Sequence, residues 1–293
     1  MSADDDALAL ATGIAADLGL PPQITRFPSG SVPVFAVGAA HVLKLFPADE
    51  ERHCRVEAAA LACIDGALSV PTPRLVASGQ RDGWWYVAMT RLHGPLLSDV
   101  WPRIPPADQL LLVRQAGRAI AELHALPTDH LDALDTDWGA FLTTQRASAV
   151  ARQASRGLVA PWLDQIEPFL ERWAPADDGR RVLLHTEVMR EHLLVQEQQG
   201  AWWLSGLFDF EPAMLGAPGY ELGSIGLFVA CAEPGLLRAF LDGYGEPIDA
   251  SPCRILAWGL LHRYSNLRWY LSRLPASPGV MSLEGLAEAW FST

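Results

Sequence analysis

Residues 181–211 place short apolar runs on both sides of a strongly charged loop, and this stretch constrains the fold more than any other. The runs 182–184 and 193–195 predict buried strands that flank the loop. A third apolar run, 204–208, ends at Asp209. Five ionisable side chains fall within eight positions of the loop: His185, Glu187, Arg190, Glu191 and His192. A merely solvated loop would not need apolar anchors on both flanks. A carboxylate at a strand end beside a second carboxylate loop is a usual arrangement for holding a divalent cation.

The polar residues of this stretch resemble the catalytic core of the aminoglycoside phosphotransferase family, whose members are relatives of the protein kinases. Members carry His-Gly-Asp, then an Asn, and further on an Ile-Asp-Phe segment. Here His185 keeps the place of the His, Thr186 stands for the Gly, and Glu187 stands for the first Asp. His192, five residues after Glu187, stands for the Asn, and Asp209 keeps the place of the second Asp. The spacing is retained while several identities differ.

The resemblance implies phosphoryl transfer and assigns a role to each of these residues. Glu187 would orient the acceptor hydroxyl as the catalytic base, with His185 and Arg190 as further catalytic residues. His192 and Asp209 would bind the metal ion. Magnesium prefers hard oxygen ligands whereas imidazole suits softer ions, so we expect Mg²⁺, with Mn²⁺ as the alternative. A second interpretation leaves Asp209 as the main metal ligand and gives His192 a hydrogen bond that fixes the loop.

A lysine and a glutamate near the start of the chain are the candidates for holding the nucleotide. The stretch 24–37 and the run 41–46, joined by the small residues 38–40, predict a hairpin, and Lys44 lies in its second strand. Alternation could simply place Lys44 on the solvated face of an edge strand. The alternative is that Lys44 reaches nucleotide phosphates. Glu57, in the predicted helix 50–64, is then its natural partner, because kinases clamp phosphates with a strand lysine and a helix glutamate.

Two backbone segments complete the nucleotide site that the resemblance implies. Ser29, Gly30 and Ser31 precede the hairpin, where a kinase-like fold turns its phosphate-covering loop. Most such triplets are plain turns, so the resemblance and not the triplet supports this assignment. Thr90 and Leu92 fall at the crossover between lobes, whose backbone would read the base.

The implied fold class is α+β, a two-lobed protein-kinase-like fold with a small β-rich N-terminal lobe and a larger, mainly helical C-terminal lobe. Residues 1–93 are expected to form the nucleotide-clamping lobe, and residues 94–293 to carry the catalytic loop and the substrate site. Amphipathic spacing predicts long helices over residues 108–125, 234–244 and 251–274 of the second lobe.

The last of these helices is expected to line the substrate site, as it does in the family that the chain resembles. Residues 251–275 contain no Asp or Glu but four arginines. Such a site is not purely acidic, which argues against a simple aminoglycoside pocket. The alternative is an ordinary packed helix whose arginines lie in water. The expected substrate contacts are Glu211, His262, Asn266 and Trp269.

Composition excludes some partners and indicates a compartment. The chain has 293 residues and a formal net charge of −12, which disfavours nucleic acid because the polyanion would be repelled. No apolar run approaches the ~20 residues of a membrane span, and the acidic start is unlike a signal peptide. The four cysteines lack paired spacing, which indicates reduced thiols and a cytoplasmic location.

These features predict a phosphotransferase that moves the γ-phosphate of ATP or GTP to a hydroxyl of an aminoglycoside, a hygromycin-like antibiotic or a related sugar-containing compound. The segments 260–262 and 283–288 resemble the hygromycin-type subgroup. The alternative is a nucleotide-binding, pseudokinase-like protein with little transfer, or one with a different nucleotide chemistry. A third interpretation is an iron site made by His185, Glu187 and His262. That site belongs to all-β jelly rolls and conflicts with the helical periodicity.

Overall fold

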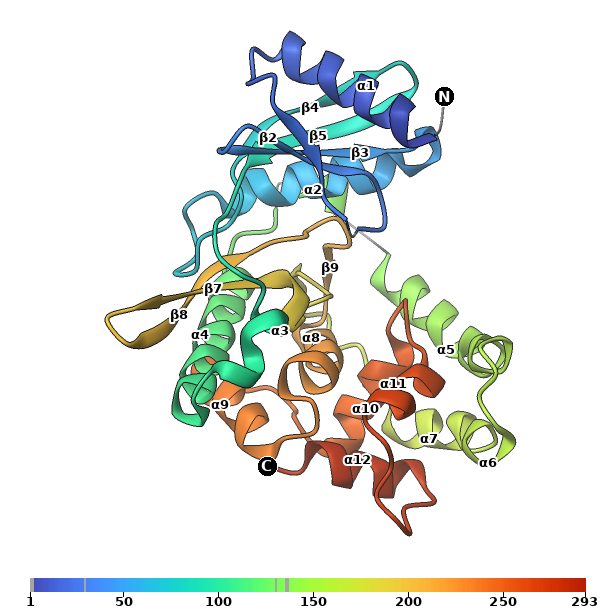
Figure 1. Ribbon diagram of the computed structural model, residues 1–293. Coiled ribbons are helices and arrows are strands. Elements are labelled where there is room, and N and C mark those ends of the chain that lie inside the picture. Colours follow the sequence, from blue (N-terminus) through green and yellow to red (C-terminus); the bar gives the residue numbers. More distant parts are fainter. Residues whose placement is uncertain (1–2, 29, 130, 135–136) are drawn as a thin grey trace.

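The structure, a computed structural model, describes residues 3–28, 30–129, 131–134 and 137–293. Figure 1 shows an N-terminal lobe around a sheet above a larger, helical C-terminal lobe. The fold class is therefore α+β, as the sequence predicts. The boundary after residue 93 stays a prediction.

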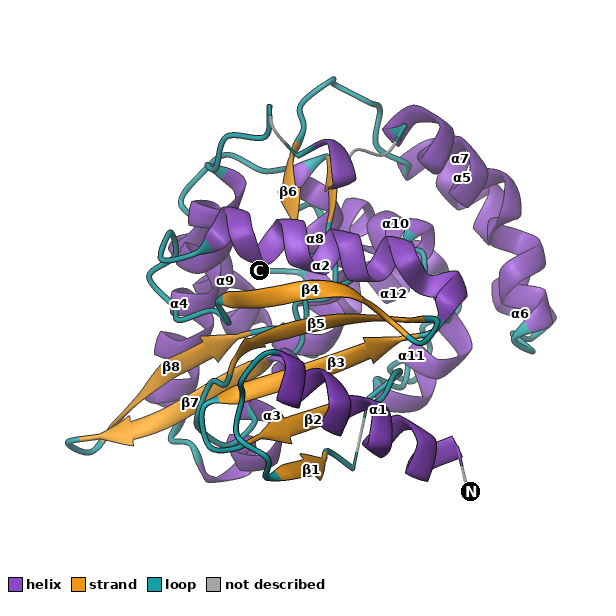
Figure 2. Ribbon diagram, turned by 90° about the horizontal axis from the view of Figure 1, so that it is seen from above, coloured by secondary structure: helices purple, strands orange, loops and turns teal. Residues whose placement is uncertain are grey.

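The N-terminal lobe is built on a five-stranded antiparallel sheet with the order β1-β2-β3-β5-β4. β3 is the central strand, and Lys44 within it pairs with Val34 on one side and Val87 on the other. The edge-strand interpretation of Lys44 is therefore wrong. Figure 2 shows α1 and α2 on opposite sides of this sheet. The bounds are β1 Ile24–Arg26, β2 Val34–Val37, β3 His41–Phe46, β4 Leu75–Arg81, β5 Trp84–Thr90, α1 Ala3–Asp17 and α2 Glu51–Ile64.

The C-terminal lobe combines helices with two antiparallel strand pairs, β6 with β9 and β7 with β8. The charged loop of the sequence joins β6 to β7. The strands are β6 Val182–Leu184, β7 Leu193–Gln198, β8 Ala201–Leu207 and β9 Met214–Gly216. The helices are α3 Leu97–Val100, α4 Pro106–His124, α5 Trp138–Ser155, α6 Ala160–Leu163, α7 Ile166–Trp173, α8 Glu221–Ser224, α9 Pro234–Tyr244, α10 Pro252–Leu261, α11 Leu267–Arg273 and α12 Leu283–Phe291.

Two glycines allow α4 and α9 to pack closely. A Cβ at Gly117 would lie 2.1 Å from the carbonyl oxygen of Phe240, and one at Gly243 would lie 2.0 Å from that of Arg114. No side chain fits at such distances, so both positions require glycine for the backbones to approach.

Two apolar clusters stabilise the fold. The smaller one lies between α1 and the sheet, where Ala11 and Ile14 pack with Phe35, Leu43 and Leu45. The larger one begins on the opposite face of the sheet, under α2, and continues through the helices of the C-terminal lobe. Val188 of the loop between β6 and β7 belongs to this larger cluster, so the loop packs on a core that spans both lobes.

The basic, aromatic segment near the C-terminus differs from its predicted form. The single helix expected over residues 251–274 is two helices, α10 and α11, separated by residues 262–266. His262 leaves the helix with ψ 141°, and the Asn266 side chain caps α11 by accepting from the Trp269 amide at 3.1 Å. The break turns His262 inward, so these residues do not share one continuous helix face.

Two expectations from composition can be compared with the structure. No helix among the described residues is long and apolar enough to cross a membrane. The four cysteines form no disulfide bond, and Cys54 and Cys253 are buried.

Candidate active site

Lys44 is buried and lies at the centre of three carboxylates that come from both lobes. Its Nζ is 3.3 Å from Glu57 Oε2 on α2. From the C-terminal lobe, Asp209 Oδ1 lies 2.6 Å and Glu211 Oε2 lies 2.5 Å from the same nitrogen. The structure thus brings together the residues predicted to hold the nucleotide and the metal. It adds Glu211, which the sequence predicts as a substrate contact.

This group holds more negative than positive charge. Burial opposes the charge on Lys44, but the three carboxylates outweigh it and raise the lysine pKa. Burial raises the pKa of Glu57 to about 7. Asp209 is partly buried, which would raise its pKa, yet the Lys44 ammonium lowers it to about 2. Apart from the Lys44 ammonium, no hydrogen-bond donor among the described residues contacts Glu57 Oε2 or Glu211 Oε2, so both oxygens keep acceptor capacity for a cation.

His192 joins this group to the predicted base, Glu187. Its Nδ1 lies 2.7 Å from the Glu187 carbonyl oxygen, and Nδ1 carries the proton because a carbonyl can only accept. Nε2 faces Asp209 Oδ2 at 3.3 Å. Metal-bound histidines commonly donate one ring N–H to a carbonyl and bind the metal through the other nitrogen. The His192 ring has this orientation. His192 therefore makes the hydrogen bond that would fix the loop. The same bond leaves Nε2 beside Asp209, where it can serve as a second metal ligand.

Further ligands for such an ion would come from outside the protein. Within the described ranges, no group of three or more His, Cys, Asp or Glu is arranged to hold a metal. Magnesium in nucleotide-dependent enzymes is commonly held by one or two carboxylates together with substrate phosphates and water. Asp209 and His192 fit that pattern, so we expect the metal to bind together with the nucleotide.

A buried carboxylate, Glu221, holds the backbone of the charged loop. It is 1% exposed and accepts hydrogen bonds from the amides of His185, at 2.5 Å, and Thr186, at 3.0 Å. Thr186 has φ 72°, a left-handed conformation that a β-branched residue keeps only where its surroundings enforce it. Burial opposes the charge on Glu221, but His124 and the loop amide lower its pKa. The ionised carboxylate therefore fixes the strained turn before Glu187.

The contacts of His185 are those of a positioning residue. Its Nε2 donates to the carbonyl of Phe208 at 2.9 Å, and its Nδ1 accepts from the Glu187 amide at 3.3 Å. Both ring nitrogens are thus bonded to backbone, and burial lowers the pKa of the imidazole. His185 links the loop that carries Glu187 to the strand end that carries Asp209.

Glu187 lines a cavity of about 310 Å³ together with three of the four predicted substrate residues, His262, Asn266 and Trp269. Burial raises the pKa of the Glu187 carboxyl. The fourth predicted substrate residue, Glu211, instead contacts Lys44. A hydroxyl compound in this cavity would lie beside Glu187 and close to the lysine–carboxylate group.

The segments predicted to contact the nucleotide lie near the same site. Ser29 falls outside the described residues, whereas Ser31 Oγ donates to Glu211 Oε1 at 3.4 Å. The Thr90 amide, at the end of β5, donates to the carbonyl of Arg74, the residue before β4, at 2.9 Å. Leu92 lies two residues after Thr90, the last paired residue of β5. Its amide makes no hydrogen bond within the described part of the chain, so it is available to a ligand.

Arg190, predicted to be catalytic, does not line the cavity that Glu187 lines. Its Nε and Nη2 donate to the carbonyl of Val229 at 3.0 and 2.7 Å. Its guanidinium stacks on Trp101, 3.5 Å from the ring centroid. These contacts place Arg190 in the wall of a second cavity, and a catalytic role stays a prediction.

Comparison with known proteins agrees with this geometry. The sequence profile described as the phosphotransferase enzyme family matches residues 23–256. The chain belongs to this family. A search of curated proteins finds no match.

Solved structures of aminoglycoside phosphotransferases share the fold of this chain. The GDP complex of aminoglycoside 2'-phosphotransferase-IIIa is 21% identical, with 96% of each chain covered and a TM-score of 0.70. APH(3'')-Id from Streptomyces rimosus is 17% identical, with 88% of this chain and 98% of that chain covered and a TM-score of 0.63. The streptomycin–ATP–APH(2")-IIa complex is 16% identical, with 97% and 98% covered and a TM-score of 0.60. The closer likeness to hygromycin-type members stays a prediction.

Sequence reasoning missed part of what this phosphotransferase-family site contains. Glu221 opens α8 and holds the amides of the charged loop, a role that the motif did not reveal. The signal was present, because Glu221 is a lone carboxylate inside an otherwise apolar run, residues 220–232. The contact of Glu211 with Lys44 left no comparable signal, since it depends on how the two lobes meet.

His262 makes the stability of the protein depend on pH. Its Nε2 donates to the Thr186 carbonyl at 3.1 Å, and its Nδ1 accepts from the Tyr264 amide at 3.3 Å. The neutral ring is satisfied, and burial lowers its pKa to about 4. The unfolded chain, with an ordinary histidine pKa, binds a proton first as the pH falls. Stability is therefore lost between about pH 6.5 and pH 4, by roughly 3 kcal/mol.

Urea unfolding of the wild type and of His262→Gln at pH 7, 5.5 and 4.5 measures this contribution. Glutamine keeps a donor for Thr186 but does not titrate, so the variant should lose less stability on acidification. His53→Gln, at a partly exposed histidine of α2, should behave as wild type. Equal pH dependence of His262→Gln and wild type would contradict the assignment.

Proposed function

We propose that this chain transfers the γ-phosphate of ATP or GTP to a hydroxyl group of a small molecule. The observation that carries the proposal is the 2.6 Å contact between Lys44 of one lobe and Asp209 of the other, beside the cavity that Glu187 lines. Structural neighbours have been solved with GDP and kanamycin, and with ATP and streptomycin, which supports a nucleotide and a small hydroxylated molecule as ligands.

The residues of the site supply what phosphoryl transfer needs, mainly positioning and charge neutralisation. Lys44, held by Glu57, neutralises phosphate charge. A divalent cation bound by Asp209, with His192 as a second ligand, would add to that neutralisation. Glu187 orients the acceptor hydroxyl and takes its proton as the bond from the hydroxyl oxygen to the γ-phosphorus forms and the bond to the bridging oxygen breaks. The burial that raises the pKa of Glu187 makes it a better base near neutral pH.

A nucleotide-binding protein with little transfer is the second candidate. Thr186, Glu187 and His192 differ from the residues of the family pattern, which favours this alternative. Thermal stabilisation by ATP or GTP, without phosphate transfer to any hydroxyl compound of a broad panel, would support it over the first candidate. The family resemblance favours an aminoglycoside or a hygromycin-like antibiotic as the acceptor. The charges of the residues that line the cavity give a separate indication of which acceptor fits.

Replacing Glu187 by Gln is expected to lower turnover by about 100-fold or more, because a general base contributes at least that factor. Nucleotide affinity should stay nearly unchanged, since Glu187 lines the acceptor cavity and makes no contact with Lys44. Steady-state kinetics and a calorimetric nucleotide titration separate the two effects. Glu171→Gln, at an exposed glutamate of α7, is the matched control. Unchanged turnover in Glu187→Gln would remove this residue from the mechanism.

Replacing His192 by Asn is expected to shift the metal preference towards magnesium. An imidazole ligand favours softer ions, whereas the amide oxygen of asparagine suits Mg²⁺. The ratio of nucleotide affinity with Mn²⁺ to that with Mg²⁺ should fall about tenfold or more, as measured by calorimetry with each ion. His53→Asn should leave the ratio as in the wild type. An unchanged ratio in His192→Asn would mean that His192 only fixes the loop.

A further inference from the structure

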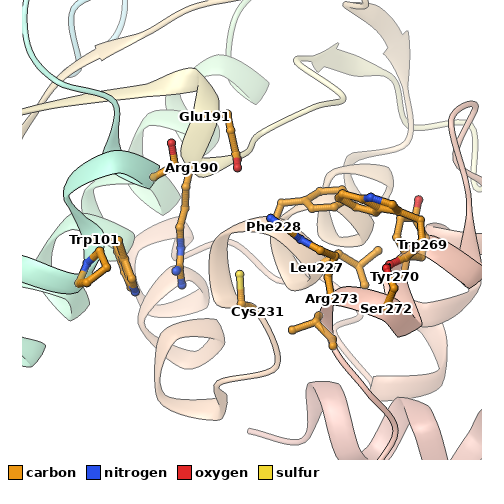
Figure 3. Close-up of a pocket in the computed structure, with 13 residues that line it drawn as sticks. Trp101, Arg190, Glu191, Leu227, Phe228, Cys231, Trp269, Tyr270, Ser272 and Arg273 are labelled. Atoms are coloured by element: carbon orange, nitrogen blue, oxygen red, sulfur yellow. The ribbon is translucent and has the colours of Figure 1, made fainter.

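A second cavity adjoins the one that Glu187 lines. It has a volume of about 570 Å³ and shares Phe228, Trp269 and Tyr270 with the smaller cavity. Figure 3 shows Arg190 and Glu191 on one side of it and Trp269, Tyr270 and Arg273 on the other. Together the two cavities form one groove that leads from Glu187 along α11.

Within the part of the chain that the structure describes, the arginines of this groove have no carboxylate partner. Arg156, in the smaller cavity, donates to the carbonyls of Tyr264, at 2.8 Å, and Ser265. Arg190 is bonded to a carbonyl and stacked on a tryptophan, and Arg273 lies 5.6 Å from the Trp269 ring centroid. Among the described residues, no carboxylate oxygen lies within 4.0 Å of these three guanidinium groups.

Several arginines outside the groove do have carboxylate partners. Arg55 binds Glu51, Arg114 binds Asp242 and Arg254 binds Asp249, at 2.6, 3.2 and 3.1 Å. The groove arginines are thus unpaired although the chain as a whole carries a formal charge of −12.

Apart from Glu187, the predicted catalytic base, the residues that line the groove carry a net positive charge. Glu187 faces the phosphoryl-transfer site, and Glu191 is the other carboxylate among the lining residues, against the three arginines. A polycationic acceptor would place its ammonium groups among guanidinium groups, at an electrostatic cost. An anionic group would instead find N–H donors that face no carboxylate, and the guanidinium fork of Arg273 matches its oxygens.

We propose that the acceptor is a hydroxyl compound that carries an oxyanion group, a carboxylate or a phosphate, on an apolar or planar frame. This inference rests on the proposed function. The hydroxyl lies against Glu187, the frame lies on Phe228 and Trp269, and the oxyanion lies between Arg190 and Arg273. Arg190 is held rigidly by its stacking and by the Val229 carbonyl, so it loses little freedom on binding. Arg273 is exposed, so its side chain is free to close on the ligand.

Replacing Arg273 gives the most specific test of the proposed oxyanion contact. It makes no hydrogen bond with the described residues and lies in the last turn of α11, so Arg273→Gln should fold as the wild type does. Arg268→Gln is the matched control, because Arg268 is an exposed arginine of the same helix and lines neither cavity. Both substitutions remove the same charge from the same element.

The experiment uses a panel of hydroxylated aromatic and sugar carboxylates and phosphates, each paired with its uncharged amide or unphosphorylated form, together with kanamycin and streptomycin. Calorimetry with a non-hydrolysable nucleotide present measures binding. The best acids should bind at least ~10-fold more tightly than their neutral partners. Arg273→Gln should remove most of that difference, and Arg268→Gln should leave it intact. Equal binding of acids and neutral partners, or no binding by any acid, would overturn the inference.

Phosphate transfer, measured on the same panel, separates this inference from the proposed function. Acids that bind through Arg273 but receive no phosphate would support the acceptor assignment and count against the transferase. Rapid transfer to kanamycin or streptomycin, with no preference for acids, would support the transferase and overturn the assignment.

Discussion

Replacing Asp209 by Asn is expected to lower nucleotide-dependent phosphate transfer on the order of 1000-fold. One carboxylate oxygen of Asp209 contacts Lys44 and the other faces His192, so this residue joins the lysine to the predicted metal position. A pKa of about 2 keeps the carboxylate ionised throughout the working range. Asparagine keeps the shape but removes the charge that a divalent cation needs. The loss corresponds to several kcal/mol of transition-state stabilisation.

The measurement is release or transfer of the γ-phosphate from ATP and GTP with Mg²⁺ and with Mn²⁺. Asp242→Asn, at an exposed aspartate paired with Arg114, is the control and should retain full activity. Thermal unfolding should show that Asp209→Asn is folded. Activity of Asp209→Asn within tenfold of the wild type would contradict the proposed site.

Replacing Glu221 by Ala is expected to lower the free energy of unfolding by about 2–5 kcal/mol, because the loop amides of His185 and Thr186 would be left buried without acceptors. The strained turn at Thr186 would also lose the group that holds it. Turnover should fall with stability, since the turn precedes Glu187. The effect is large because the carboxylate is buried and ionised, so alanine replaces a charged acceptor by a void.

Urea unfolding at pH 7 measures this effect. Glu246→Ala removes an exposed glutamate two residues after the end of α9 and should change stability by no more than ~0.5 kcal/mol. A loss in Glu221→Ala that is no larger than in this control would show that other contacts hold the turn.

The sequence predicts the local elements of this fold well, because apolar spacing reports directly on which residues are buried. The predicted hairpin is β2 with β3, the predicted strand 182–184 is β6, and the predicted helix 234–244 is α9. Lys44 and Glu57 were placed on a strand and a helix by pattern. Their meeting with Asp209 followed from the family resemblance, since no spacing rule links residues 165 positions apart.

What the sequence did not predict depends on contacts between distant segments. The break between α10 and α11 occurs where His262 turns inward to the Thr186 carbonyl, an interaction that helical periodicity does not reveal. The irregular helix Ile225–Ala230 ends at Cys231 with φ 52°, and no glycine signals that turn. The groove between Arg190 and Arg273 likewise requires three segments to come together in space. The composition of residues 251–275 indicated only that this segment is basic, and not that it lines a groove.

The most direct test of the central claim is a crystal structure of the protein with a non-hydrolysable ATP or GTP analogue and Mn²⁺. The account predicts phosphate oxygens within hydrogen-bond distance of Lys44 Nζ and an anomalous manganese peak at Asp209, with the γ-phosphate facing Glu187. A nucleotide bound elsewhere, or manganese away from Asp209, would contradict it.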